Sequence, residues 1–325
     1  MLAVEYLRAG ELVAFPTETV YGLGGDARRD DVVRKIYAAK GRPGNNPVIV
    51  HVAEADDAKE YAEHWNGVAE RLAKHFWPGP LTMILPRGQK LSAAVSAGRH
   101  TVAVRCPKHP VAEALLRAFG GPIAAPSANR SGFTSPTAAS HVMAELAGRV
   151  PLILDGGPCR IGLESTVIDI SSGDVPTVLR PGAVTLEMLR EAIGDVQLSI
   201  RTVDNNEAAA SPGMQDRHYA PRTPACRFNK SQWPAALAWA QQHQPVGLIS
   251  CDDAVLLAAP HETVRMPEDE FEYARALYGA LRELDEKGLK AILVLMPEKN
   301  EGVWVAVADR LRRATVELPA AEARR

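Results

Sequence analysis

Single basic residues and small polar side chains recur where strand-like segments of this chain end. The cations are Lys40, Arg42, Arg105 and Arg180, and the neutral donors are Thr19, Asn46, Thr101, Ser127, Ser135 and Ser165. Cations stabilise charge on phosphate oxygens, whereas hydroxyl and amide groups orient a small polar substrate. This set of side chains favours phosphoryl or nucleotidyl transfer, which depends mainly on positioning and charge stabilisation.

Three of these sites have a structural interpretation as well. In KGRPGNNP (40–47), Lys40 and Arg42 could grip phosphate, but taken alone a C-terminal helix cap is the favoured interpretation. His51 in VIVHVA is, by itself, more often a structural residue than a catalytic base. Arg105 lies in an apolar strand and needs an anion there, and a protein carboxylate and a ligand are equally favoured.

Two polar loops are candidate ligand contacts. PTETVYGLGGDARRD (16–30) reads as a tight turn with glycines at 22, 24 and 25, between a strand and a helix. APSANRSGFTSPT (125–137) presents small hydroxyl and amide groups to a ligand rich in oxygen; alternatively, Ser135 or Thr134 caps the next helix. Such loops at the ends of strands are the usual place of an α/β binding crevice.

Several function classes are disfavoured. The sequence has no GxxxxGK[ST] loop, no good GxGxxG, no GxSxG elbow and no HExxH motif. The four cysteines are far apart, which indicates free thiols in a reducing compartment and no metal cluster. The net charge of −2 gives no global attraction to nucleic acid. The N-terminus does not resemble a signal peptide and no apolar run could span a bilayer, so a cytoplasmic protein is predicted.

The elements that must position these residues divide the chain. Residues 1–200 alternate strands and helices, with some strands adjacent in sequence, which predicts a mixed α/β sheet. Residues 201–224 have no hydrophobic period and read as a linker. Residues 225–325 predict a small C-terminal βαβ-type domain.

Taken together, the motifs resemble one family. PTETVYGLGGDA, KGRPGNNPVIVHV, WPGPLTMIL, TVAVRCP, APSANRSG, GLESTVIDI and LRPGAVT are similar, in order, to the YrdC-like threonylcarbamoyl-AMP synthases. SPGMQDRHYAP and the C-terminal segment resemble the long, two-domain form. The resemblance implies a twisted mixed sheet around a concave cavity and a Rossmann-like second domain. It also implies synthesis of threonylcarbamoyl-AMP from L-threonine, bicarbonate and ATP with Mg²⁺, with release of pyrophosphate.

The resemblance also implies roles for individual residues. Lys40 and Arg42 would be catalytic, with Lys40 contacting phosphates or bicarbonate. Threonine would be held by Thr19, His51, Arg105, Ser165 and the backbone of Ala125, and Arg105 would pair with its carboxylate. ATP would be held by Arg42, Asn46, Thr101, Ser127, Ser135, Arg180 and Tyr219. The amine would lose its proton to His51, water or ATP, and the sequence does not choose among them.

The product would pass to a tRNA threonylcarbamoyl transferase complex, which modifies an adenosine next to the anticodon. Whether this chain binds tRNA stably by itself is left open. The linker, with Arg217, His218 and Tyr219, is interpreted as a lid that excludes water, or else as a passive tether. Two alternative functions are an RNA-binding module and a carbamoyl-transfer domain of the hydrogenase-maturation type. Aromatic residues are only 6%, which disfavours RNA binding.

Overall fold

The computed structural model describes residues 2–200 and 218–319, so most of the predicted linker lies outside the described residues. The described chain forms two compact units. One holds residues 2–131 and 135–200, and the other holds residues 132–134 and 218–319. In these residues no helix combines the length and the apolar character needed to cross a bilayer.

The first unit is built on a mixed ten-stranded sheet in the order β10-β9-β8-β4-β5-β3-β6-β2-β1-β7. Its strands are β1 (Val13–Phe15), β2 (Gly22–Asp26), β3 (Ile49–His51), β4 (Leu81–Pro86), β5 (Thr101–Arg105), β6 (Ile123–Ala124), β7 (Leu152–Ile153), β8 (Thr166–Asp169), β9 (Thr177–Arg180) and β10 (Gln197–Leu198). Its helices are α1 (Leu2–Arg8), α2 (Asp30–Lys40), α3 (Ala55–Lys59), α4 (Gly67–Phe76), η1 (Ala93–Ser96), α5 (Pro110–Phe119), α6 (Ala139–Leu146) and α7 (Leu186–Ile193).

The predicted glycine turn is wrong, because Gly22, Gly24 and Gly25 lie inside strand β2. Packing explains the glycines there. A Cβ on Gly24 would come within 2.7 Å of Phe15 and 2.9 Å of Ile123, and one on Gly25 within 2.6 Å of Val32. Thr19, the candidate ligand contact of this motif, therefore lies before the strand, in the loop 16–21.

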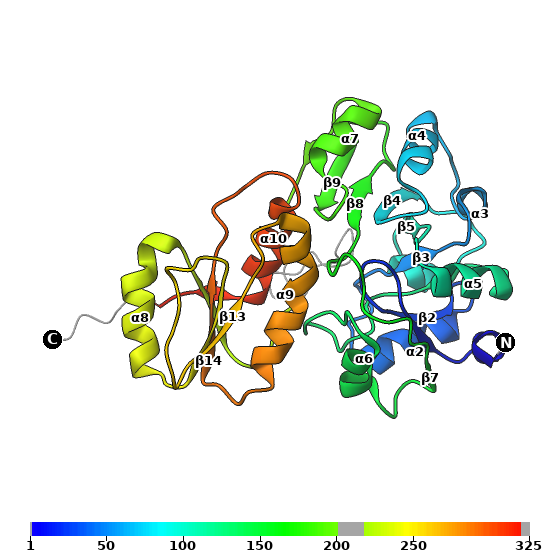
Figure 1. Cartoon of the computed structure of the whole chain (residues 1–325). Helices are drawn as coiled ribbons and strands as arrows, with labels where there is room; N and C mark the ends of the chain where they lie inside the picture. The colour runs from blue at the N-terminus through cyan, green and yellow to red at the C-terminus, as the bar shows by residue number, and fades with distance from the viewer. Residues whose placement is uncertain (1, 201–217, 320–325) are drawn as a thin grey trace. The chain divides into compact units, whose positions relative to one another are not determined.

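Helices cover the two faces of this sheet unequally. One face carries the large core, where apolar side chains of β3, β4 and β5 pack with α2, α4 and α7; α4 and α7 lie side by side in Figure 1. On the other face, α1 and α5 pack together over β1 and β6. Beyond them, on the part of that face over β3, β4, β5 and β8, Ile49, Ile84, Ala103 and Val167 form one small apolar cluster among the described residues.

The second unit is a five-stranded parallel sheet in the order β13-β12-β14-β11-β15. Figure 1 shows α8 against one face of it and α9 with α10 against the other, a Rossmann-like arrangement. Its elements are β11 (Ala225–Phe228), η2 (Lys230–Gln232), α8 (Trp233–Gln242), β12 (Val246–Ser250), β13 (Glu262–Arg265), α9 (Glu270–Asp285), β14 (Ala291–Leu295), α10 (Trp304–Ala314) and β15 (Val316–Glu317).

Candidate active site

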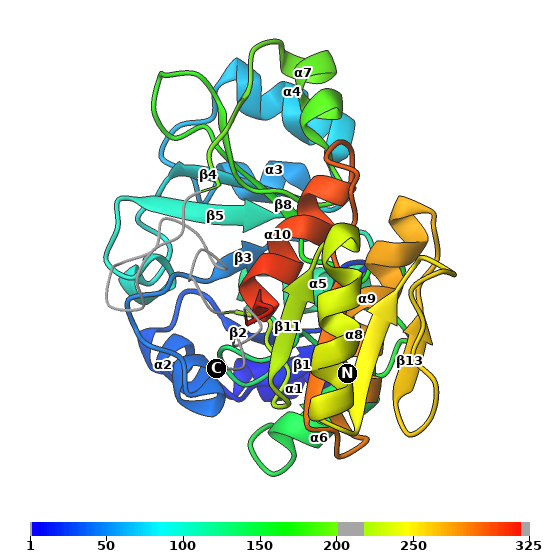
Figure 2. The same ribbon diagram turned by 90° about the vertical axis from the view of Figure 1, so that its left-hand side faces the viewer.

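Strand register places several predicted site residues on the sparsely covered face of the first unit. His51 lies opposite Arg105 across β3 and β5, and Val167 lies opposite both Thr82 on β4 and Arg180 on β9. Residues directly opposite each other in a sheet share a face. Figure 2 shows β4 and β5 side by side, as their antiparallel pairing requires. Residues far apart in sequence thus meet in one row.

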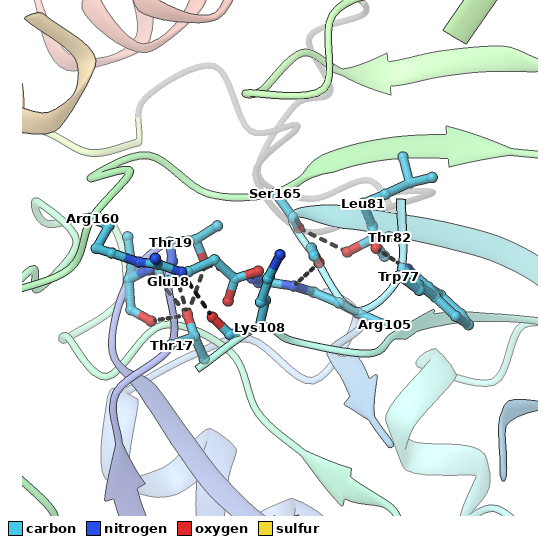
Figure 3. Close-up of polar contacts among 12 residues, drawn as sticks. Thr17, Glu18, Thr19, Trp77, Leu81, Thr82, Arg105, Lys108, Arg160 and Ser165 are labelled. Atoms are coloured by element: carbon cyan, nitrogen blue, oxygen red, sulfur yellow. Dashed lines mark hydrogen bonds and ion pairs between the residues drawn. The ribbon is translucent and has the colours of Figure 1, made fainter. Parts of the chain in front are cut away.

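Arg105 is the centre of a buried polar cluster in Figure 3. Its Nε donates to the Gly79 carbonyl (3.2 Å), its Nη1 donates to Thr19 Oγ1 (2.9 Å), and its Nη2 lies 2.7 Å from Glu18 Oε1. Side chains of Arg105 and Glu18 are 4% and 3% exposed. The anion that the strand arginine requires is therefore a protein carboxylate, Glu18, which sequence reasoning did not single out.

The Thr19 hydroxyl is held in place by its own loop. Thr17 Oγ1 lies 2.8 Å from Thr19 Oγ1 and donates to the Val20 carbonyl (2.6 Å), a local turn of the kind that threonine favours. The loop is also anchored at Glu18 and Thr19, whose carbonyls accept from the backbone amides of Ile161 and Gly162. Thr19 and Arg105 are thus presented together by two strand ends.

A second cluster surrounds Ser165, at the start of β8. Its hydroxyl lies 2.7 Å from Thr82 Oγ1 and accepts from Arg180 Nη2 (3.1 Å), while its carbonyl accepts from Arg180 Nε (3.1 Å). The turn after Arg180 needs Gly182, because a Cβ there would lie 2.5 Å from the Thr166 nitrogen. Thr82 is a further candidate that the sequence did not reveal, since its partner is far away in the chain.

The neighbouring Glu164 accepts a short hydrogen bond from Ser135 Oγ, 2.5 Å, which links the loop before α6 to the start of β8. Ser135 is fully buried. The alternative expectation, that Ser135 or Thr134 caps the next helix, is wrong, because α6 begins after Ala138 and has no side-chain cap.

Lys40 and Arg42 bond to the protein backbone. Lys40 Nζ donates to the carbonyls of Ser127 and Asn129, each at 2.5 Å, and only 2% of the residue is exposed. Burial, and then the nearby Arg42, lower the pKa of Lys40 well below its usual value. Arg42 donates to the Asn46 side chain (2.5 Å) and to the Pro47 carbonyl (2.8 Å). Gly41 closes α2 in a left-handed conformation, so Lys40 both ends the helix and fixes the loop 126–131.

His51 is buried in an apolar environment. Its ring meets that of Phe15 edge-on at 6.2 Å, and its Nδ1 has no hydrogen-bond partner among the described residues. Burial, and then the charge of Arg105, lower the pKa of His51 to about 3. Its imidazole is therefore neutral at physiological pH and is a poor proton acceptor.

The remaining predicted residues, Ala125, Thr101 and Tyr219, lie outside the two side-chain clusters described above. Ala125 is buried, and its amide donates to the Ile49 carbonyl (2.8 Å). Thr101 begins β5, at the opposite end of that strand from Arg105. Tyr219 belongs to the second unit, where its ring stacks on Tyr278 (5.8 Å) and the Arg310 guanidinium lies over it (5.2 Å).

The described residues contain no group of three or more His, Cys, Asp or Glu side chains that could hold a metal ion. The acidic side chains described above are already paired: Glu18 with Arg105 and Glu164 with Ser135. Chemically, this part of the first unit offers buried cations and hydroxyls, which suit an anionic or zwitterionic ligand.

Comparison with known proteins gives consistent matches over nearly the whole chain. The family model "Telomere recombination", which covers Sua5, YciO and YrdC, matches residues 5–182. The model "Threonylcarbamoyl-AMP synthase, C-terminal domain" matches residues 184–316.

Individual relatives agree with these models. The threonylcarbamoyl-AMP synthase of Bacillus subtilis is 43% identical over 96% of this chain and 91% of its own length. That of Pyrococcus abyssi is 40% identical over 97% and 93%. The crystal structure of P. abyssi Sua5 with L-threonine superposes with a TM-score of 0.89 at 38% identity, covering 98% of this chain and 95% of that one.

Proposed function

The chain belongs to the threonylcarbamoyl-AMP synthase family in its long, two-domain form, and we propose that it makes threonylcarbamoyl-AMP from L-threonine, bicarbonate and ATP, releasing pyrophosphate. The observation that carries the proposal is the buried cluster of Arg105, Thr19 and Glu18, because it offers opposite charges and a hydroxyl to a free amino acid. The near-complete coverage of relatives with this name disfavours an RNA-binding module and a hydrogenase-maturation carbamoyl-transfer domain.

Threonine would bind at the Arg105 cluster. Two of the five N–H groups of Arg105 donate to Gly79 and Thr19, and its Nη2 lies 2.7 Å from Glu18 Oε1, so N–H groups of this guanidinium would remain for the threonine carboxylate. Thr19 and Ser165 would contact the amino acid through hydroxyls. His51 and Ala125 would shape the site from the adjacent strands β3 and β6, with His51 acting as a neutral ring.

ATP would bind along the same face through Arg180, Ser135 and Ser127 and, near the start of β3, through Arg42, Asn46 and Thr101. The β3–β5 register supports this grouping, because continuing it two residues before the Ile49–Ala103 pair would set Pro47 beside Thr101. Lys40 would act by positioning the loop of Ser127, since its ammonium is already bonded to that loop. Tyr219 remains a proposed ATP contact.

Mg²⁺ would enter with ATP. A carboxylate cage is not needed for this ion, because Mg²⁺ commonly binds through substrate phosphates and water. The ion would neutralise phosphate charge, and the chain would contribute the guanidinium groups of Arg42 and Arg180 to the same end.

The proposed chemistry has two bond-forming steps. The neutral amine of threonine attacks bicarbonate, giving a carbamate and water. A carbamate oxygen then attacks the α-phosphorus of ATP, and pyrophosphate leaves. Buried guanidinium groups stabilise the charge that develops on the phosphate oxygens. With its pKa lowered to about 3, His51 is unsuited to taking the amine proton.

The mixed anhydride would be handed to a tRNA threonylcarbamoyl transferase complex, because its acyl group is activated for transfer to an amine. A cytoplasmic location is consistent with that partner and remains a prediction.

The Arg105→Gln variant tests the proposed threonine site. We expect the KM for threonine to rise at least about 100-fold, because a charge-assisted, two-point contact to a carboxylate is lost. The KM for ATP should change by less than about 3-fold, because the proposed ATP contacts do not include Arg105. Pyrophosphate release at varied threonine and ATP gives both constants.

Arg117→Gln is the matched control, because Arg117 is 61% exposed and pairs only loosely with Glu54 at 3.4 Å. Since Arg105→Gln leaves Glu18 buried without its cation, circular dichroism must show that the variant is folded. An unchanged KM for threonine in a folded Arg105→Gln protein would exclude Arg105 from the threonine site.

A further inference from the structure

Glu18 carries a buried carboxylate oxygen without a partner. The side chain is 3% exposed, and Oε1 pairs with Arg105 Nη2 at 2.7 Å. Oε2 has no hydrogen-bond partner within residues 2–200 and 218–319. A buried polar atom without a partner costs free energy, and such atoms concentrate where a ligand completes the bonding.

Among the described residues, Arg105 is in ion-pair contact with Glu18, and Figure 3 also shows Arg160 and Lys108 nearby. Other titratable groups that interact with Glu18 include His109, Cys106 and Cys159. Burial raises the pKa of both thiols to about 12, so they are neutral. Burial lowers the pKa of His109, so that imidazole is neutral at pH 7 as well. A second cation can therefore approach Oε2 without repulsion from these three groups.

A free amino acid has the matching charges. Its carboxylate and its ammonium are attached to the same carbon, so the site must place a cation next to an anion. Arg105 and Glu18 do this with side chains in ion-pair contact, and Figure 3 shows them pointing toward each other beside Thr19.

We propose that Glu18 binds the α-ammonium of threonine through Oε2 and accepts its proton. This inference rests on the proposed function, because it assigns a catalytic residue to that same site. Arg105 holds the carboxylate, and Glu18 holds the amine.

One N–H bond of the ammonium breaks and an O–H bond forms at Glu18, so that the ammonium and the carboxylate both become neutral. The nitrogen lone pair then forms a bond to the carbon of bicarbonate, and water leaves to give the carbamate. Glu18 returns its proton to solvent before the next turnover.

The test compares threonine with 2,3-dihydroxybutanoate of matching stereochemistry, which replaces the amine by a hydroxyl and keeps the carboxylate. We expect the wild-type protein to bind threonine at least about 10-fold more tightly than the analogue in calorimetry. In Glu18→Gln, the preference should fall below about 3-fold, and threonine-dependent pyrophosphate release should fall at least about 100-fold.

Two controls separate the possible outcomes. Glu54→Gln removes an exposed carboxylate, 62% accessible, and should preserve the preference. Arg105→Gln should weaken the binding of threonine and the binding of the analogue by similar factors. If Glu18→Gln weakens the binding of both ligands equally, Glu18 acts only by orienting Arg105 and the inference is overturned.

The wild-type comparison remains decisive if Glu18→Gln does not fold. Equal affinity of the wild-type protein for threonine and the analogue would overturn the inference while leaving the proposed function intact. A wild-type protein that neither binds threonine nor releases pyrophosphate with it would overturn both.

Discussion

Arg105 and His51 are buried opposite each other on β5 and β3. The guanidinium of Arg105 pairs with Glu18, whereas burial lowers the pKa of His51 and keeps its imidazole neutral. That Arg105 needs an anion follows from the sequence alone. The identity of the anion does not, because Glu18 comes close only through the folding of distant segments.

The buried, neutral His51 predicts a particular acid sensitivity. The pKa of His51 is about 3 in the folded chain and near the ordinary 6.5 when unfolded, so the unfolded state binds more protons below pH 6.5. The contribution of neutral His51 to the free energy of unfolding is complete above about pH 6.5 and is lost as the pH falls toward 3. Between pH 7.5 and pH 5, the wild-type protein should lose about 2 kcal/mol more unfolding free energy than His51→Gln.

Urea unfolding at both pH values measures this difference. Exposed carboxylates titrate in both proteins and cancel in the comparison. An identical loss of stability in wild type and His51→Gln would show that His51 is not held neutral by the fold.

At the scale of elements, strongly patterned segments are predictable and glycine-rich or very short ones are not. Apolar runs at 47–52, 81–85, 101–106 and 165–170 predict strands, and a helical pattern near 268–287 predicts a long helix; the structure has β3, β4, β5, β8 and α9 there. Strand β2 is missed, because glycines signal a turn unless close packing is known. The two-residue strand β10 of the first unit and the exposed strand β13 of the second unit have little apolar pattern, so the sequence does not reveal them.

Helix α10 offers an element-scale prediction. Asp309 accepts from Arg310 Nη1 (2.7 Å) and Arg313 Nε (2.9 Å), and all three side chains are at most 4% exposed. Asp309→Asn removes the negative charge from beside two buried guanidinium groups. We expect a loss of about 3–5 kcal/mol in the stability of the second unit.

Hydrogen exchange of α10 peptides, followed by mass spectrometry, reports on this unit directly. Glu317→Gln is the control, because its carboxylate is 84% exposed and its ion pair with Arg227 contributes about 1 kcal/mol or less. Equal exchange rates in the two variants would contradict the assigned importance of the Asp309 cluster.

At the scale of the whole molecule, family membership joins the two units to one activity. The motifs of the first 200 residues identify the family, and the match over 184–316 adds the long form. The general composition of the chain predicts neither, since net charge and cysteine spacing only exclude other classes. Four candidates chosen from the sequence, Thr19, Arg105, Ser165 and Arg180, lie within two bonded clusters in the structure. The partners Glu18 and Thr82 become apparent only from the three-dimensional structure.

The most direct test of the account is pyrophosphate release from ATP by the purified full-length protein with Mg²⁺. Threonine and bicarbonate are supplied together, singly or not at all. We expect release only when both are present, because the carbamate that attacks ATP is made from them. Release that is absent under all conditions, or that does not depend on threonine, would contradict the proposed synthase activity.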